Sequence, residues 1–193
     1  MKTIAWDIDD VLNDLMRSWF EQKWIKEHGG CKLKYSGLSE NPPHKLLGVG
    51  IEEYFSSLDE FRLSPLYQQM SPTEEVRKWF AKYGHRFRHI ALTAAPLIAV
   101  SASAQWVFRH YGNWIRTFHF VPSKRKGQEM PEYERDKEDF LKWISKVDLL
   151  IDDSASNIMG AEKAGCKGIL MPRPWNRSKI SIGETLSILT DTV

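Results

Sequence analysis

The chain has few cysteines, almost no net charge and no long apolar run. Its two cysteines, Cys31 and Cys166, lie far apart and outside any CxxC or Cys/His pattern, so the sequence supports neither a disulfide framework nor a zinc site. With 27 basic against 25 acidic side chains, the net charge of +2 gives no reason to expect a stable nucleic-acid complex or a membrane-binding surface. No apolar run approaches the roughly 18 residues of a membrane-spanning helix, and residues 1–7 reach an acidic residue too soon for a signal peptide. We therefore expect a soluble, cytoplasmic protein.

The chain does have an alternation of short apolar segments with amphipathic ones. Its 193 residues suffice for one domain that buries about 70% of its unfolded surface. The periodicity predicts strands over 3–8, 88–93, 117–121, 147–151 and 168–171, and helices over 11–25, 71–83, 97–111, 137–145 and 154–164. Strands that alternate with helices of this length form parallel sheets. The predicted fold is α/β, a doubly wound, Rossmann-like parallel sheet with helices on both faces.

Residues 14–70 interrupt this alternation. The breakers Asn41-Pro42-Pro43 and Gly48-Val49-Gly50 leave only a short helix indicated near residues 51–58. We interpret the segment as a small, mainly helical lid (cap) inserted after the first strand. The core would then consist of residues 1–13 and 71–193.

Two local motifs follow the insertion. Ser71-Pro72-Thr73-Glu74 has the pattern of a capping box, which predicts a helix with proline at its first position. His85 and His89 are four residues apart, as metal ligands on a helix would be. Because Gly84 ends the helix before them and a strand follows, we expect both histidines at the surface.

Polar side chains gather where the predicted strands end. In open parallel sheets, ligands bind beyond the carboxyl ends of the strands. A single acid there is usually a turn residue or a helix N-cap, but two acidic pairs at one edge would repel each other unless a cation lay among them. Carboxylate oxygens suit Mg²⁺, which also leaves room for a phosphate. The residues concerned are Asp7, Asp9, Asp10, Thr93, Asp152 and Asp153.

These residues, in this order, resemble a known family. Asp7-Ile8-Asp9-Asp10-Val11, Thr93, Lys137 and Asp152-Asp153 are similar to the four ordered motifs of the haloacid dehalogenase-like phosphatases. Arg135-Asp136-Lys137, followed by the segment from Asp148 to Asp153, resembles the 5′(3′)-deoxyribonucleotidase branch more closely. The resemblance implies a Mg²⁺-dependent enzyme that removes phosphate from a small monoester, with a (deoxy)nucleoside monophosphate as the expected substrate.

The resemblance also implies roles for the acids. Asp7 would be the nucleophile that forms an aspartyl-phosphate, and Asp9 would protonate the leaving oxygen and later activate water. Asp7, Asp9 (through its backbone carbonyl) and Asp153 would hold the Mg²⁺, with Asp152 as a support.

The same resemblance assigns the phosphate-binding groups. Thr93 would donate its hydroxyl, Ala94 its backbone N–H, and Lys137 would neutralise charge on the phosphoryl group. Lys124 is the alternative if Lys137 points away from the acids. Two positions depart from the family pattern: Asp10 stands where many members have glycine, and Ala94 where the deoxyribonucleotidases carry a second hydroxyl residue.

Substrate identity is expected to depend on the lid and on the last strand end. Aromatic residues make up 12% of the chain, and aromatic faces stack on nucleobases. Phe55 and Phe61 follow no helical period, so we take them, with Arg173, as candidate substrate-binding residues.

Other functions stay open on the sequence. The same machinery could act on a sugar or another small-molecule phosphate, or the protein could bind phosphate without catalysis as a regulatory protein. A receiver-type signalling domain would need its phosphoacceptor on a middle strand, where Val121-Pro122-Ser123 offers no acid. A monomer and a dimer are equally compatible with the sequence.

Overall fold

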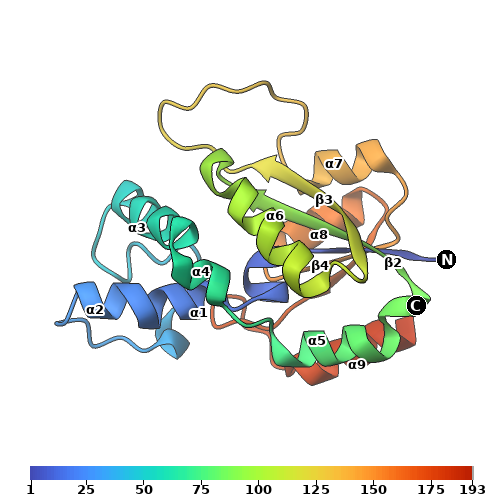
Figure 1. Cartoon of the computed structure of the whole chain (residues 1–193), viewed down its shortest axis with the longest axis horizontal. Coiled ribbons are helices and arrows are strands. Elements are labelled where there is room, and N and C mark those ends of the chain that lie inside the picture. Colours follow the sequence, from blue (N-terminus) through green and yellow to red (C-terminus); the bar gives the residue numbers. More distant parts are fainter. Residues whose placement is uncertain (193) are drawn as a thin grey trace.

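A computed structural model of the protein describes residues 1–192 and is built on a parallel sheet (Figure 1). The strands lie in the order β3-β2-β1-β4-β5, and each neighbouring pair is parallel. Their bounds are β1 (Thr3–Trp6), β2 (Arg88–Ala95), β3 (Ile115–Pro122), β4 (Leu149–Asp152) and β5 (Lys167–Leu170). The predicted fold class is confirmed. No helix in this part of the chain is long and apolar enough to cross a membrane.

Helices cover both faces of the sheet because each strand alternates its side chains between the faces. Ile4 and Trp6 pack into one apolar cluster with α5, α6 and α9, whereas Ala5 packs into a second with α7 and α8. The helices are α5 (Glu74–Tyr83), α6 (Leu97–Tyr111), α7 (Lys137–Ile144), α8 (Ala155–Lys163) and α9 (Ile182–Thr192). Of these, α9 was not predicted from the sequence. The two-sided burial is what a doubly wound fold requires.

The segment between β1 and α5 forms a helical body beside the sheet (Figure 1). Its two connections to the core run side by side: Asn13 and Pro72 form an antiparallel bridge, and the Thr73 N–H donates to the Leu12 carbonyl over 2.9 Å. Its helical pieces are α1 (Leu15–Trp19), η2 (Phe20–Trp24), α2 (Ile25–Glu27), η3 (Tyr35–Gly37), α3 (Ile51–Leu63) and α4 (Pro65–Gln69). We refer to this body, residues 14–70, as the cap.

The first helix begins later than the periodicity of residues 11–25 predicts. A separate turn, η1 (Ile8–Leu12), precedes it, and α1 starts only at Leu15. The interruption is a backbone one, because Asp10 has φ of 63° and Asn13 is extended, and neither conformation continues a helix.

The capping-box prediction at residues 71–74 is also wrong. Helix α5 begins at Glu74, and its N-cap residue Thr73 makes no side-chain capping bond. Pro72 instead pairs with Asn13 across the two connections to the cap. The tertiary contact of the linker has therefore overridden the local helix-start signal.

His89 is buried, which corrects the expectation that it lies at the surface; His85 is exposed. The indole N–H of Trp6 donates to Nδ1 of His89 over 3.0 Å, so the ring proton sits on Nε2 and donates to the Gly84 carbonyl over 2.8 Å. Burial lowers the pKa of His89 to about 4, against a smaller opposing effect of the Gly84 carbonyl. The imidazole is a neutral core group with both nitrogens satisfied.

The buried His89 makes the free energy of unfolding depend on pH. The unfolded chain takes up a proton at His89 below about pH 6.5, whereas the folded chain resists protonation until about pH 4. Stability is therefore present above pH 6.5 and falls as the pH drops through this window, by up to about 3 kcal/mol. We expect the unfolding free energy of the wild type, measured in denaturant and relative to His89→Gln, to decrease by that order between about pH 7.5 and pH 4. A constant difference would contradict the assignment.

Candidate active site

The carboxyl ends of the three central strands meet at one cavity of about 330 Å³. β2 and β3 follow on one side of β1, and the chain then crosses over to place β4 and β5 on the other side. This reversal of strand order opens a crevice beside β1. Asp7 directly follows β1, Thr93 lies near the end of β2, and Asp153 directly follows β4. The sequence-predicted residues that line the cavity are Asp7, Asp9, Thr93, Ala94, Lys137 and Asp153.

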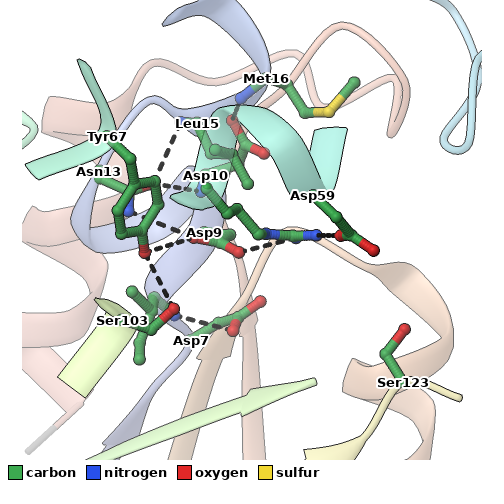
Figure 2. Close-up of polar contacts among 12 residues, drawn as sticks. Asp7, Asp9, Asp10, Asn13, Leu15, Met16, Asp59, Tyr67, Ser103 and Ser123 are labelled. Atoms are coloured by element: carbon green, nitrogen blue, oxygen red, sulfur yellow. Dashed lines mark hydrogen bonds and ion pairs between the residues drawn. The ribbon is translucent and has the colours of Figure 1, made fainter. Parts of the chain in front are cut away.

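The loop after β1 folds so that its acids separate. The Asp7 carboxylate accepts the N–H of Ile8 over 2.8 Å, which holds it at the strand end. Asp10 takes a left-handed conformation that aspartate tolerates better than most residues, and its carboxylate turns back to accept the N–H of Met16 over 3.0 Å (Figure 2). The extra acid at this position is therefore a structural group that anchors the first turn of the cap.

Lys137 is the cation at the centre of the site. It is the first residue of α7, whose N-cap Asp136 accepts the N–H of Asp139, and its side chain is only 2% exposed. Its Nζ lies 2.8 Å from Oδ1 of Asp7 and 2.6 Å from Oδ2 of Asp152. Burial alone would lower the pKa of Lys137, but Asp152 and Asp7 outweigh it and raise the pKa above its ordinary value. Lys137 is thus a permanent ammonium ion between two carboxylates.

The carboxylates of Asp7, Asp152 and Asp153 converge, with one oxygen of each within 4.8 Å of the others. Burial raises the pKa of Asp7 well above its ordinary range despite Lys137, and burial with repulsion from Asp152 and Asp10 raises that of Asp153 to about 8. Three acids facing one ammonium leave an excess of negative charge in a buried place. The cluster therefore fits a divalent cation.

The oxygens left over show which acids could bind that cation. Both oxygens of Asp152 are already contacted, because Oδ1 accepts from Ser154 and Asn157 while Oδ2 faces Lys137. Asp7 is contacted at Oδ1, by the Ile8 N–H and by Lys137. Asp153 is contacted at Oδ2, by the indole N–H of Trp175 over 2.7 Å. Within residues 1–192, no donor occupies the second oxygen of either acid. Asp7 and Asp153 are the candidate ligands, and Asp152 positions Lys137.

The Asp9 carboxylate does not join this cluster. Its Oδ2 lies 2.9 Å from Nη2 of Arg62 on α3, and the Tyr67 hydroxyl approaches its Oδ1 at 3.4 Å (Figure 2). The metal role that the sequence predicts for the Asp9 backbone carbonyl stays a prediction. Arg62 and Tyr67 lie more than 50 positions along the chain from Asp9, and no sequence signal connected them to it.

Three expected substrate residues lie outside the cavity. Phe61 is buried in the apolar core, and Phe55 lies under the guanidinium of Arg125, 4.1 Å from it. Arg173 donates to the Asp10 carbonyl over 2.5 Å and pairs with Asp14 over 2.8 Å, so it braces the loop after β1. Lys124 pairs with Glu132 at the surface, which leaves Lys137 as the lysine of the site.

Comparisons with known proteins agree with this architecture at the level of three-dimensional structure. A haloacid dehalogenase-like hydrolase from Streptococcus pneumoniae superposes with a TM-score of 0.66 at 10% identity, over 100% of this chain and 99% of its own. A haloacid dehalogenase superfamily hydrolase, subfamily IA, from Geobacter sulfurreducens gives a TM-score of 0.57 at 17% identity, with 100% of both chains covered. The chain has the haloacid dehalogenase-like fold.

Other matches to this fold include a Lactobacillus delbrueckii protein assigned as a phosphoglycolate phosphatase, with a TM-score of 0.61 at 13% identity over 97% of both chains. No family model and no curated protein sequence matches the chain. At these identities the likeness establishes the haloacid dehalogenase-like fold and leaves activity to the argument from the site.

Cation binding can be tested without an activity assay. We expect Mg²⁺ at about 100 times its Kd to raise the Tm of the wild type by about 5–10 °C. The shift should grow from about pH 6 to about pH 9, because below a pKa of about 8 the ion must displace the proton of Asp153.

Asp153→Asn should abolish most of this shift while leaving the metal-free protein at least as stable, since it removes a repelling charge. The exposed Asp191→Asn on α9 is the matched control and should keep the wild-type shift. An equal shift in Asp153→Asn would exclude Asp153 as a ligand.

Proposed function

We propose that the protein is a Mg²⁺-dependent phosphomonoester hydrolase that works through an aspartyl-phosphate on Asp7. The observation that carries the proposal is the buried Lys137 ammonium, held 2.8 Å from Asp7 and 2.6 Å from Asp152, next to an acid pair with free oxygens. A carboxylate nucleophile, a fixed cation and a metal site at one strand edge are the parts that phosphoryl transfer requires. The match to hydrolases of the haloacid dehalogenase-like fold is consistent with it.

The residues divide the reaction between them. An oxygen of Asp7 attacks phosphorus, the P–O bond of the ester breaks, and the leaving oxygen takes a proton from the Asp9 carboxyl. Asp9 then removes a proton from water, whose oxygen attacks the aspartyl-phosphate and releases inorganic phosphate while Asp7 is regenerated. Lys137 holds Asp7 in place and offsets charge on the transferred group.

Phosphate binding uses groups on neighbouring strand ends. Thr93 and Ala94 line the cavity beside Asp7 and would supply a hydroxyl and a backbone N–H. The bound Mg²⁺ supplies charge neutralisation for a phosphate that would otherwise face several carboxylates. Asp7 and Asp153, with the Asp9 carbonyl, would hold it.

We propose a (deoxy)nucleoside monophosphate as the substrate. The cap side of the cavity carries apolar and aromatic side chains, among them Met16, Tyr54 and Leu58, and Trp175 lies on the core side. Tyr54 is only 2% exposed, whereas Trp175 is half-buried and can present a ring face that stacks on a base, a role the sequence suggested for Phe55 and Phe61. On this proposal residues 14–70 act as the unit that recognises the leaving group, above the core of residues 1–13 and 71–193.

Removing the nucleophile tests the reaction. We expect wild-type protein with Mg²⁺ to turn over p-nitrophenyl phosphate, EDTA to abolish turnover, and Asp7→Asn to lower kcat by about 10⁴-fold or more. Asp191→Asn serves again as the exposed control and should be fully active. Turnover by Asp7→Asn equal to that of the wild type would refute the mechanism, and absence of turnover in the wild type would favour a phosphate-binding protein.

A substrate panel tests the nucleotide proposal. We expect kcat/KM for deoxynucleoside monophosphates to exceed that for sugar phosphates by about tenfold or more, the value of one stacked base. Trp175→Leu should reduce this ratio, whereas Trp143→Leu, at a side chain 71% exposed, should leave it unchanged. Equal kcat/KM for both substrate classes would contradict the nucleotide proposal and would favour a phosphatase that acts on another small-molecule phosphate.

A further inference from the structure

Asp9 is the end of a chain of alternating charges that crosses from the core through the cap and back to the core. Nη2 of Arg62 lies 2.9 Å from Asp9, Nη1 of the same guanidinium lies 3.0 Å from Asp59, and Arg125 binds Asp59. Asp9 and Asp59 are both labelled in Figure 2. The four side chains are between 8% and 13% exposed. At this burial, ion pairs are weakly screened and depend strongly on geometry.

The far end of the chain is a two-point contact. Nε of Arg125 lies 2.6 Å from Oδ2 of Asp59 and Nη2 lies 2.9 Å from Oδ1. The same guanidinium lies over the ring of Phe55, which is one helical turn before Asp59 on α3. It also donates to the Ser123 carbonyl over 3.0 Å. Arg125 belongs to the long connection between β3 and α7 that loops out beyond the sheet (Figure 1). A two-point pair between a guanidinium and a carboxylate fixes the relative orientation of the two groups as well as the distance between them.

At the near end, the contacts leave Asp9 one open acceptor position. A carboxylate has about four lone-pair sites. On Oδ1 they face the Tyr67 hydroxyl and the side-chain amide of Asn13, and on Oδ2 one faces Arg62. No other side chain in the described part of the chain donates to Asp9, so the remaining site on Oδ2 is available to the cavity that Asp9 lines.

Arg62 is suited to positioning Asp9 rather than to binding a substrate anion. Arg62 lines the cavity, but each of its two terminal nitrogens already contacts a carboxylate, and its Nε is buried. Its charge is matched by Asp9 and Asp59 together, with Arg125 balancing the second acid.

We propose that Arg62 is a positioning residue for Asp9, and that the Asp59–Arg125 pair holds Arg62 in the orientation that aims Asp9 at the leaving oxygen. The inference rests on the proposed function and adds to it the cap residue on which proton transfer depends. Asp9 is thereby correctly oriented only while the cap contacts the connection between β3 and α7.

The test compares leaving groups. kcat/KM reports steps up to formation of the aspartyl-phosphate, and p-nitrophenolate leaves without a proton whereas an alkoxide needs one. We expect Arg62→Gln to lower kcat/KM about 100-fold or more for an alkyl phosphate but less than about tenfold for p-nitrophenyl phosphate. Arg125→Gln should act in the same direction with a smaller ratio.

Two further variants separate positioning from loss of structure. Arg62→Lys should restore part of the alkyl phosphate activity, because an ammonium keeps the positive charge beside Asp9 but lacks the planar, two-pronged geometry with which the guanidinium contacts Asp9 and Asp59. Arg135→Gln removes an exposed arginine of the same connection, paired with Asp139 at the surface, and should change neither substrate. Thermal melts of each variant establish that it is folded.

The outcomes are distinct. Equal losses for both esters in folded Arg62→Gln and Arg125→Gln would overturn the inference while leaving the phosphatase mechanism intact. Failure of the wild type to hydrolyse either ester would overturn the proposed function, and the inference with it. A loss confined to the alkyl ester in both variants supports the positioning role.

Discussion

The site depends on one buried ammonium ion. Lys137 bridges the carboxylates that follow β1 and end β4, and so joins α7 to two neighbouring strands at the point where the sheet order reverses. Without it, Asp7, Asp152 and Asp153 would crowd together with no internal cation, and buried charges of one sign are strongly unfavourable. The same ion that permits the acids to converge also aligns Asp7. On the proposed function, stability and chemistry therefore rest on the same contact.

Two arginines extend this arrangement to the loop after β1. Arg173, beyond β5, holds the backbone of Asp10 and the side chain of Asp14, while Arg62 of the cap holds the side chain of Asp9. Contacts from the core and from the cap therefore both fix this loop, and the Asp10 carboxylate accepts the Met16 N–H at the start of α1. If Asp9 transfers a proton as proposed, contacts that fix its position in this way reduce the reorganisation needed when it acts. The cap is consequently part of the site and not only a cover over it.

Much of the core could be read from residue patterns, because strand and helix periodicity report which side chains must be buried. The helix over residues 97–111 was predicted at its observed bounds, and the rule that ligands gather at strand ends placed Asp7, Thr93 and Asp152 at the same edge. Where patterns failed, a tertiary contact had won: Pro72 pairs with Asn13 instead of opening α5, and His89 satisfies both ring nitrogens in the core. Local signals carry no information about such partners.

The sequence by itself determined the α/β class, the parallel sheet and the order of the acidic motifs, because these follow from periodicity and from the chemistry of adjacent residues. Only the tertiary structure decided that Asp152 faces Lys137, that Asp9 turns to Arg62 instead of joining the other acids, and that Arg173 braces a loop. Each of these pairings joins segments that are separated along the chain. The strength of an ion pair depends on the distance between the two charges in space, and the linear order of residues does not give that distance.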